Sequence, residues 1–177
     1  MHCTSDSGRR QDLSQSICSL GLGVCMLLAG CNGEKVLFTE LAGIGGDGWA
    51  YSDSIRFSFD VSDTSQVYRL QLEVAHDPEY AWENVYVRIL TAFPDDSVKT
   101  DILSLELSDG AGAWQGQCSG STCRLGIPLQ ARVRFPMPGT YGLTFVQHMR
   151  QEVVPGIDGF RLSVIQLAED SAGRLNQ

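Results

Sequence analysis

The chain has 177 residues and carries 13 basic against 21 acidic residues, which gives a formal net charge of −8 at pH 7. Nucleic acid phosphates and anionic lipid headgroups repel such an acidic chain, so we exclude nucleic acid as a partner and a basic patch as a membrane anchor. The length suits one domain with a flanking segment, because a chain of this size builds a single core.

An apolar run at residues 17–28 ends in the motif Leu28-Ala29-Gly30-Cys31. The run is too short to span a bilayer and has the length of the apolar part of a secretory signal. The motif resembles a bacterial lipobox, whose cysteine carries a diacylglyceryl group. We therefore predict a lipoprotein signal peptide at 1–30 and lipidation at Cys31, with acyl chains such as palmitate as the membrane anchor. A short buried helix and an ordinary cleavable signal are the alternatives.

Residues 31–48 are rich in glycine and contain one short apolar stretch at 36–41. Glycine-rich segments behave as flexible linkers. We expect this segment, with the lipidated cysteine at its start, to be a tether with room for one strand. The folded domain is then expected at residues 49–177.

From residue 49 onward the apolar side chains recur with a period of two, which is typical of strands with one buried face. Turn residues such as Asp109-Gly110 and Pro138-Gly139 separate these segments, and no window shows sustained helical periodicity. Pro128 places part of one strand at a sheet edge or a bulge. Seven or eight short strands predict an all-β antiparallel sandwich, of jelly-roll or immunoglobulin-like type. The expected strands are 55–60, 68–74, 84–91, 103–108, 125–135, 141–145 and 160–164, and the tether can hold an eighth.

Two cysteines, Cys118 and Cys123, lie outside the signal peptide and the lipobox. In an oxidising envelope compartment two such cysteines favour a disulfide. A redox or metal-binding pair is the alternative, but the spacing is not Cys-x-x-Cys and no histidine lies near it in the sequence.

Candidate catalytic residues are scarce. His76 and His148 are the two histidines beyond the signal, and neither a Gly-x-Ser-x-Gly nor a His-Glu-x-x-His motif occurs. We predict no enzymatic activity, catalytic residue, metal or cofactor, although carboxylates from distant strands leave glycoside hydrolysis open. Three tryptophans, Trp49, Trp82 and Trp114, are either core anchors or, if exposed together, a platform for sugars or a protein partner.

The C-terminal third carries Gln147-His148-Met149-Arg150, then Pro155-Gly156-Ile157 and Gly159. This order resembles the end of the gliding-motility lipoproteins usually called GldH. Other segments fit in the same order: Tyr68 to Asn84 with Tyr80 and Trp82, Leu103 with Asp109-Gly110 and Trp114-x-Gly116, and Phe135-Pro136 with Gly139 and Tyr141. The cysteine loop is a departure from the family pattern, and His76 stands where that pattern has an arginine.

The resemblance implies a non-enzymatic lipoprotein of the Bacteroidetes cell envelope, facing the periplasm and working in gliding motility and protein secretion. Its expected partners are the membrane, through the lipid anchor, and other envelope proteins; the choice between inner and outer membrane is open. Met149 and Arg150 are candidates for partner binding. Alternatively they fix a turn, with Arg150 pairing with Glu152 or Asp158. A lipid-anchored carbohydrate-binding module is the second hypothesis, motivated by the sandwich pattern and the tryptophans.

Overall fold

The computed structural model describes residues 33–168, and these residues form antiparallel strands without a helix. The predicted all-β sandwich is confirmed. None of the described elements is a helix long and apolar enough to cross a bilayer. The strands are β1 (Lys35–Gly43), β2 (Trp49–Ala50), β3 (Ile55–Val61), β4 (Tyr68–His76), β5 (Asn84–Ala92), β6 (Val98–Glu106), β7 (Gln117–Ser119), β8 (Thr122–Val133), β9 (Gly139–Gln147), β10 (Val153–Val154) and β11 (Ile157–Gln166).

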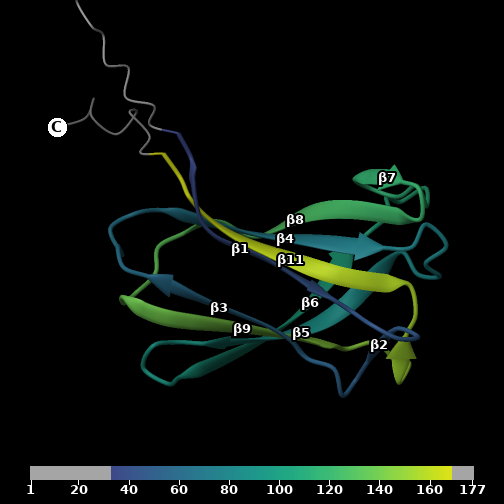
Figure 1. Ribbon diagram of the computed structural model, residues 1–177, viewed down its shortest axis with the longest axis horizontal. Coiled ribbons are helices and arrows are strands. Elements are labelled where there is room, and N and C mark those ends of the chain that lie inside the picture. Colours follow the sequence, from purple (N-terminus) through teal and green to yellow (C-terminus); the bar gives the residue numbers. More distant parts are fainter. Residues whose placement is uncertain (1–32, 169–177) are drawn as a thin grey trace, which may run out of the picture. The chain divides into compact units, whose positions relative to one another are not determined.

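Two sheets face each other across one core (Figure 1). One sheet has the order β1-β11-β4-β8-β7, the other has the order β3-β9-β5-β6, and β2 and β10 form a separate two-stranded ribbon. Many neighbours in a sheet are distant in sequence, so long connections cross between the sheets. Every pairing between these strands is antiparallel.

The alternation of side chains explains the strands. In β3 the residues at odd positions from Ile55 to Val61 are buried, and those between them are exposed. This is the pattern of a strand with one face on a core and the other in water. All seven strands expected beyond residue 49 are present. The short strands β2, β7 and β10 were missed, because two or three residues show no periodicity.

Pro128 lies at an irregularity, as predicted. The register between β4 and β8 shifts where Leu70 faces Gln130 and Gln71 faces Pro128. The free side of β8 at this point has no strand beside it among the described residues, since β7 pairs only with residues 122–124. Proline is tolerated here because no ladder bond needs its missing N–H.

The strand expected inside the tether is β1, which pairs with β11 from Lys35 to Gly43. It forms an edge of the five-stranded sheet, and its Phe38 ring lies 5.7 Å from the Phe59 ring of the opposite sheet. The sandwich therefore begins at Lys35 and includes much of the segment that we had assigned to the tether. Cys31 lies outside the described residues.

A row of aromatic rings runs through the centre of the core. The Trp49 ring lies 4.9 Å from Phe160, Phe160 stacks on Phe145 at 6.0 Å, and Phe145 meets Phe57 edge-on at 5.8 Å. These rings come from both sheets and from β2, so the row joins all three. Aromatic pairs at such distances add to the stabilisation that burial alone provides.

The sandwich has two ends, and different residues close them. The "phenylalanine end" lies where β1 begins and β8 and β11 finish, and its rings are Phe38, Phe59, Tyr68, Phe93, Phe135 and Tyr141. The "disulfide end" lies where β4 finishes and β8 begins. Its rings are His76, Tyr80, Trp82 and Trp114.

Candidate functional site at the disulfide end

Three connections build the disulfide end, and backbone hydrogen bonds join them to each other or to the strands. Residues 77–83 follow β4, residues 107–116 follow β6, and residues 148–156 lie between β9 and β11. The Asp77 amide donates to the Gly156 carbonyl at 2.8 Å, and the Leu107 amide donates to the Glu83 carbonyl at 2.8 Å. This end is therefore an assembly of loops with defined positions.

Two glycines explain parts of the sequence motifs. Gly116, at φ 87°, turns the chain into β7, and a Cβ at this position would lie 2.2 Å from the Arg124 carbonyl oxygen. Gly156, at φ 82°, makes the turn into β11, where a Cβ would approach the Tyr80 ring to 3.2 Å. Only glycine combines a positive φ with such close approach. The glycines of the Trp-x-Gly and Pro-Gly-Ile motifs are thus needed for the backbone conformation of the two turns.

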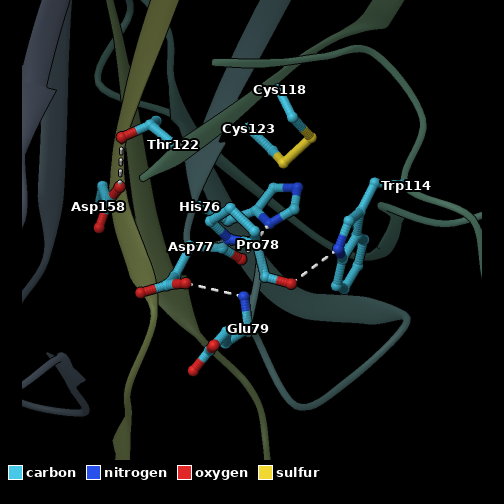
Figure 2. The surroundings of a disulfide bond; sticks show 9 residues. All are labelled: His76, Asp77, Pro78, Glu79, Trp114, Cys118, Thr122, Cys123 and Asp158. Atoms are coloured by element: carbon cyan, nitrogen blue, oxygen red, sulfur yellow. Dashed lines mark hydrogen bonds between the residues drawn. A yellow bond between two sulfur atoms is a disulfide. The ribbon is translucent and has the colours of Figure 1, made fainter. Parts of the chain in front are cut away.

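A disulfide joins Cys118 to Cys123, as predicted. The two residues are directly opposite in the β7–β8 hairpin, with Gly120 at φ 61° in the turn. Cys118 is exposed, whereas Cys123 is completely buried. The crosslink thus joins an exposed residue to a buried one, and Figure 2 shows it beside the His76 ring.

His76 is the buried neighbour of this disulfide. It is the last residue of β4, directly opposite Cys123 of β8, and its exposed fraction is 0%. Its Nδ1 lies 2.9 Å from the Asp77 carbonyl oxygen, while its Nε2 has no hydrogen-bond partner among the described residues. Sequence analysis names His76 but does not place it beside the disulfide, because antiparallel pairing brings together residues that are far apart in the sequence.

Aromatic rings surround His76. The Trp114 ring lies 4.7 Å away edge-on and the Tyr80 ring lies 6.0 Å away. The Tyr80 hydroxyl donates to the Asn84 carbonyl at 3.1 Å, and burial raises the pKa of Tyr80 well above its usual range. His76 and Cys123 of the cysteine loop, which are far apart in the sequence, are thus neighbours beside these aromatic rings.

The three tryptophans do not form one platform. Trp49 is completely buried in the core, and its indole N–H donates to the Asp53 carbonyl at 2.7 Å. Trp82 and Trp114 are half-buried at the disulfide end, where Tyr80 lies between them at 5.3 and 6.4 Å. The Trp114 N–H donates to the Pro78 carbonyl at 2.8 Å, so it ties two loops together.

Met149 and Arg150 lie in the connection after β9. The Met149 sulfur accepts a hydrogen bond from the Tyr86 amide at 3.2 Å, and its carbonyl accepts one from the Tyr51 hydroxyl. Arg150 is exposed and, within residues 33–168, pairs with neither of its expected acids. The expected ion pair is therefore wrong. Gln147 holds this turn instead: it is fully buried, its Nε2 donates to the Gln151 carbonyl, and its Oε1 accepts from the Met149 amide.

Two other features complete the description of the surface. An apolar hollow lies at the open side of the sandwich between β6 and β8, lined by Leu70, Thr91, Gln130 and Leu143 among others. Within residues 33–168, no three His, Cys, Asp or Glu side chains are grouped so that they could hold a metal ion.

The fold and its site define an antiparallel β-sandwich in which a disulfide crosslinks the β7–β8 hairpin next to the buried His76. A family model described as "GldH lipoprotein" matches residues 36–163, which cover both sheets. The chain belongs to the GldH lipoprotein family, and the predicted resemblance is confirmed. A "Gliding motility lipoprotein GldH homolog" from Christiangramia forsetii is 24% identical over 126 residues, which are 71% of this chain and 76% of that protein.

Two solved structures show a weak likeness to this chain. An arabinose-bound α-L-arabinofuranosidase is 9% identical with a TM-score of 0.35, and the match covers 76% of this chain and 23% of that one. Dimeric latent PorU from Porphyromonas gingivalis is also 9% identical, with a TM-score of 0.26, and covers 78% of this chain and 14% of that one. The chain thus spans less than a quarter of the length of either.

Proposed function

We propose that this chain is a non-enzymatic, lipid-anchored envelope protein that works with the machinery of gliding motility and protein secretion. Membership of the GldH lipoprotein family is the observation that carries the proposal. The name of the Christiangramia forsetii relative, a gliding motility lipoprotein homologue, supports it. The lipobox at Leu28-Ala29-Gly30-Cys31 supplies the anchor, with 1–30 removed as the signal peptide.

An anchor at Cys31 would hold the sandwich close to the membrane. Lys35, the first residue of β1, follows Cys31 by four positions. Four extended residues span at most about 14 Å. We infer that the phenylalanine end, where β1 starts, faces the periplasmic side of the membrane, and that the disulfide end points away from it.

The disulfide end then presents the surface for other envelope proteins. Tyr51 and Tyr86 are each 44% exposed on either side of the half-buried Met149, and Arg150 is exposed beside them. Tyrosine, methionine and arginine are enriched in protein interfaces and their hot spots. Trp82 adds a half-buried ring at the same end. We propose these side chains, rather than the buried Trp49, as the contact residues for a protein partner.

The anchor is tested by Cys31→Ser expressed in the native organism. We expect the wild-type protein in the membrane fraction and the variant in the soluble fraction, because the thiol that accepts the lipid is lost. Retention of the variant in the membrane would contradict anchoring at Cys31. Metabolic labelling with a palmitate analogue provides a direct readout of the lipid.

The role is tested by complementing a deletion strain and measuring surface spreading and protein secretion. We expect wild-type protein to restore both, and Arg150→Glu combined with Trp82→Ala to restore them poorly, because the partner surface is changed. Lys99→Glu is the matched control, since Lys99 is an exposed cation at the phenylalanine end. Normal spreading and secretion in the deletion strain would contradict the proposal as a whole.

Carbohydrate binding stays the second candidate because Trp82, Tyr80 and Trp114 lie together at one end. The core position of Trp49 and the use of the Trp114 N–H by Pro78 reduce the rings available to a sugar. Calorimetry of the purified protein against envelope and plant glycans tests the idea. Heat of binding that disappears in Trp82→Ala would favour it, and no binding to any glycan would end it.

A further inference from the structure

The two sulfurs of the disulfide are unequal as targets for a thiol. Cys118 is exposed on β7, whereas Cys123 is completely buried on β8. Thiol–disulfide exchange requires a thiolate to reach one sulfur, and its rate depends on access and on how well the other sulfur leaves. The structure therefore directs attack to Cys118, and the buried Cys123 is the sulfur that leaves.

His76 lies where that leaving sulfur can find a hydrogen-bond partner. The Asp77 carbonyl can only accept, so Nδ1 of the neutral imidazole carries the hydrogen and Nε2 presents a lone pair. Nε2 is buried and has no partner within residues 33–168. His76 and Cys123 are opposite each other in the β4–β8 pair, and Figure 2 shows the imidazole beside the disulfide.

An oxidised disulfide has no S–H group, so it leaves the His76 lone pair without a donor. In the reduced protein the Cys123 thiol can donate to Nε2. An unsatisfied buried acceptor is costly, and the donor appears only on reduction. The reduced state therefore gains a hydrogen bond that the oxidised state lacks, which is the reverse of what a permanent crosslink requires.

We propose that Cys118, Cys123 and His76 form a thiol–disulfide exchange site whose reaction partner is a protein dithiol. One thiolate of the dithiol attacks Sγ of Cys118; a mixed disulfide forms, and the Cys118–Cys123 bond breaks with its electron pair going to Cys123. Cys123 takes up a proton from water and donates the new S–H to Nε2 of His76. The second thiolate of the dithiol then closes its own disulfide and releases Cys118, which is protonated. Two electrons and two protons pass to the protein, and the dithiol is oxidised.

The equilibrium with dithiothreitol tests the role of His76 in the purified protein. In His76→Phe, which removes the acceptor, we expect the ratio of reduced to oxidised protein to fall about tenfold, the equivalent of about 1.4 kcal/mol. In His76→Gln, whose amide oxygen can accept, we expect much of the wild-type ratio to return. Tyr80→Phe is the matched control in the same pocket. It leaves the Nε2 lone pair of His76 in place, so the ratio of reduced to oxidised protein should stay within about twofold of wild type. A ratio unchanged in His76→Phe would overturn the proposal.

A measurement without substitution covers the case in which His76→Phe does not fold. In protein labelled with nitrogen-15 histidine, we expect the Nε2 resonance of oxidised protein at the position of an unprotonated, unbonded nitrogen. Reduction should move it in the direction of a hydrogen-bonded acceptor. An Nε2 that carries the hydrogen in the oxidised protein, or a resonance that stays in place on reduction, would overturn the proposal.

The site of attack is tested with reduced glutathione and mass spectrometry. We expect the first mixed disulfide at Cys118, with Cys123 as the free thiol that alkylation then labels. Glutathione found first on Cys123 would refute the assigned order. None of these measurements depends on anchoring or on motility, so their failure and the failure of the proposed function can be told apart.

Discussion

The two ends of the sandwich are both closed by aromatic rings, but the rings have different supports. At the phenylalanine end, Phe59 of β3 and Tyr141 of β9 are directly opposite each other in the β3–β9 pair, and their rings stack at 6.0 Å. Tyr68 and Tyr141 each donate their hydroxyl hydrogen to a nearby carbonyl, at 2.7 and 2.8 Å. This end is therefore an extension of the core: four of its six rings lie on strands, and Phe93 and Phe135 lie within two residues of the ends of β5 and β8.

At the disulfide end, Tyr80, Trp82 and Trp114 lie on loops, and a disulfide and a buried histidine accompany them. The His76 Nε2 has no partner there. Loops placed by a rigid scaffold are where binding and reactive groups concentrate. One end of the sandwich thus stabilises the fold, while the other uses that stability to hold exposed and unsatisfied groups.

The largest effect is expected at the phenylalanine end. Tyr141 is 1% exposed, and its ring contacts Phe59, Phe93 and Phe135. Tyr141→Ala should lower the free energy of unfolding by about 3–5 kcal/mol, because it opens a cavity among packed rings. Urea denaturation followed by fluorescence measures this. Tyr141→Phe is the control and should cost only about 1 kcal/mol, for its hydrogen bond; equal losses in both variants would refute the cavity argument.

A smaller effect is expected from the crosslink at the other end. Replacing both cysteines, Cys118→Ala with Cys123→Ala, should lower the free energy of unfolding by about 2 kcal/mol, because the disulfide closes only a short loop. Cys118→Ala with Cys123→Ser should lose about 1 kcal/mol less, since the introduced hydroxyl can donate to His76. Chemical denaturation of the two double variants measures the difference. Identical stabilities would show that the His76 lone pair has no accessible donor at residue 123.

The smallest effect depends on pH and compares one tyrosine from each end. Burial raises the pKa of Tyr80, and burial together with the Asp63 charge raises the pKa of Tyr68. Because the pKa of each tyrosine is higher in the folded than in the unfolded protein, the contribution of its protonated hydroxyl to stability is fully present below the unfolded pKa of about 10. That contribution declines as the pH rises above this value. We expect Tyr80→Phe to lower the free energy of unfolding by about 1 kcal/mol at neutral pH. It should also reduce the loss of stability at alkaline pH more than Tyr68→Phe does. Denaturation midpoints between about pH 8 and pH 11 measure this; parallel curves for wild type and both variants would contradict it.

Much of the sandwich was predictable because apolar and polar side chains alternate along a strand that has one buried face. The buried residues of β3, of β4 up to Val74 and of β9 recur at every second position, so their faces could be assigned before their neighbours were known. The disulfide was predictable for a different reason. Only two cysteines remained after the lipobox, and in an oxidising compartment these two have only each other.

Local patterns also explain the errors. The first strand, β1, has an exposed, weakly alternating pattern because it lies at a sheet edge, so it resembled a tether. The expected pairing of Arg150 with a nearby acid assumed that proximity in sequence produces contact. Instead the buried Gln147 satisfies the carbonyls of the turn, and within residues 33–168 Arg150 forms an ion pair with neither acid.

The amino-acid sequence is enough to recognise the lipobox motif, the two-residue periodicity, the pair of cysteines and the order of motifs that identifies the family, because each of these is a local or ordered property of the chain. The folded structure is needed to show which tryptophan lies in the core, which end carries the loops, and which residue lies beside the disulfide. His76 is opposite Cys123 because β4 and β8 pair in one register among many that alternation alone permits. Such pairings depend on the packing of the whole core, and the chemistry of the disulfide end follows from them.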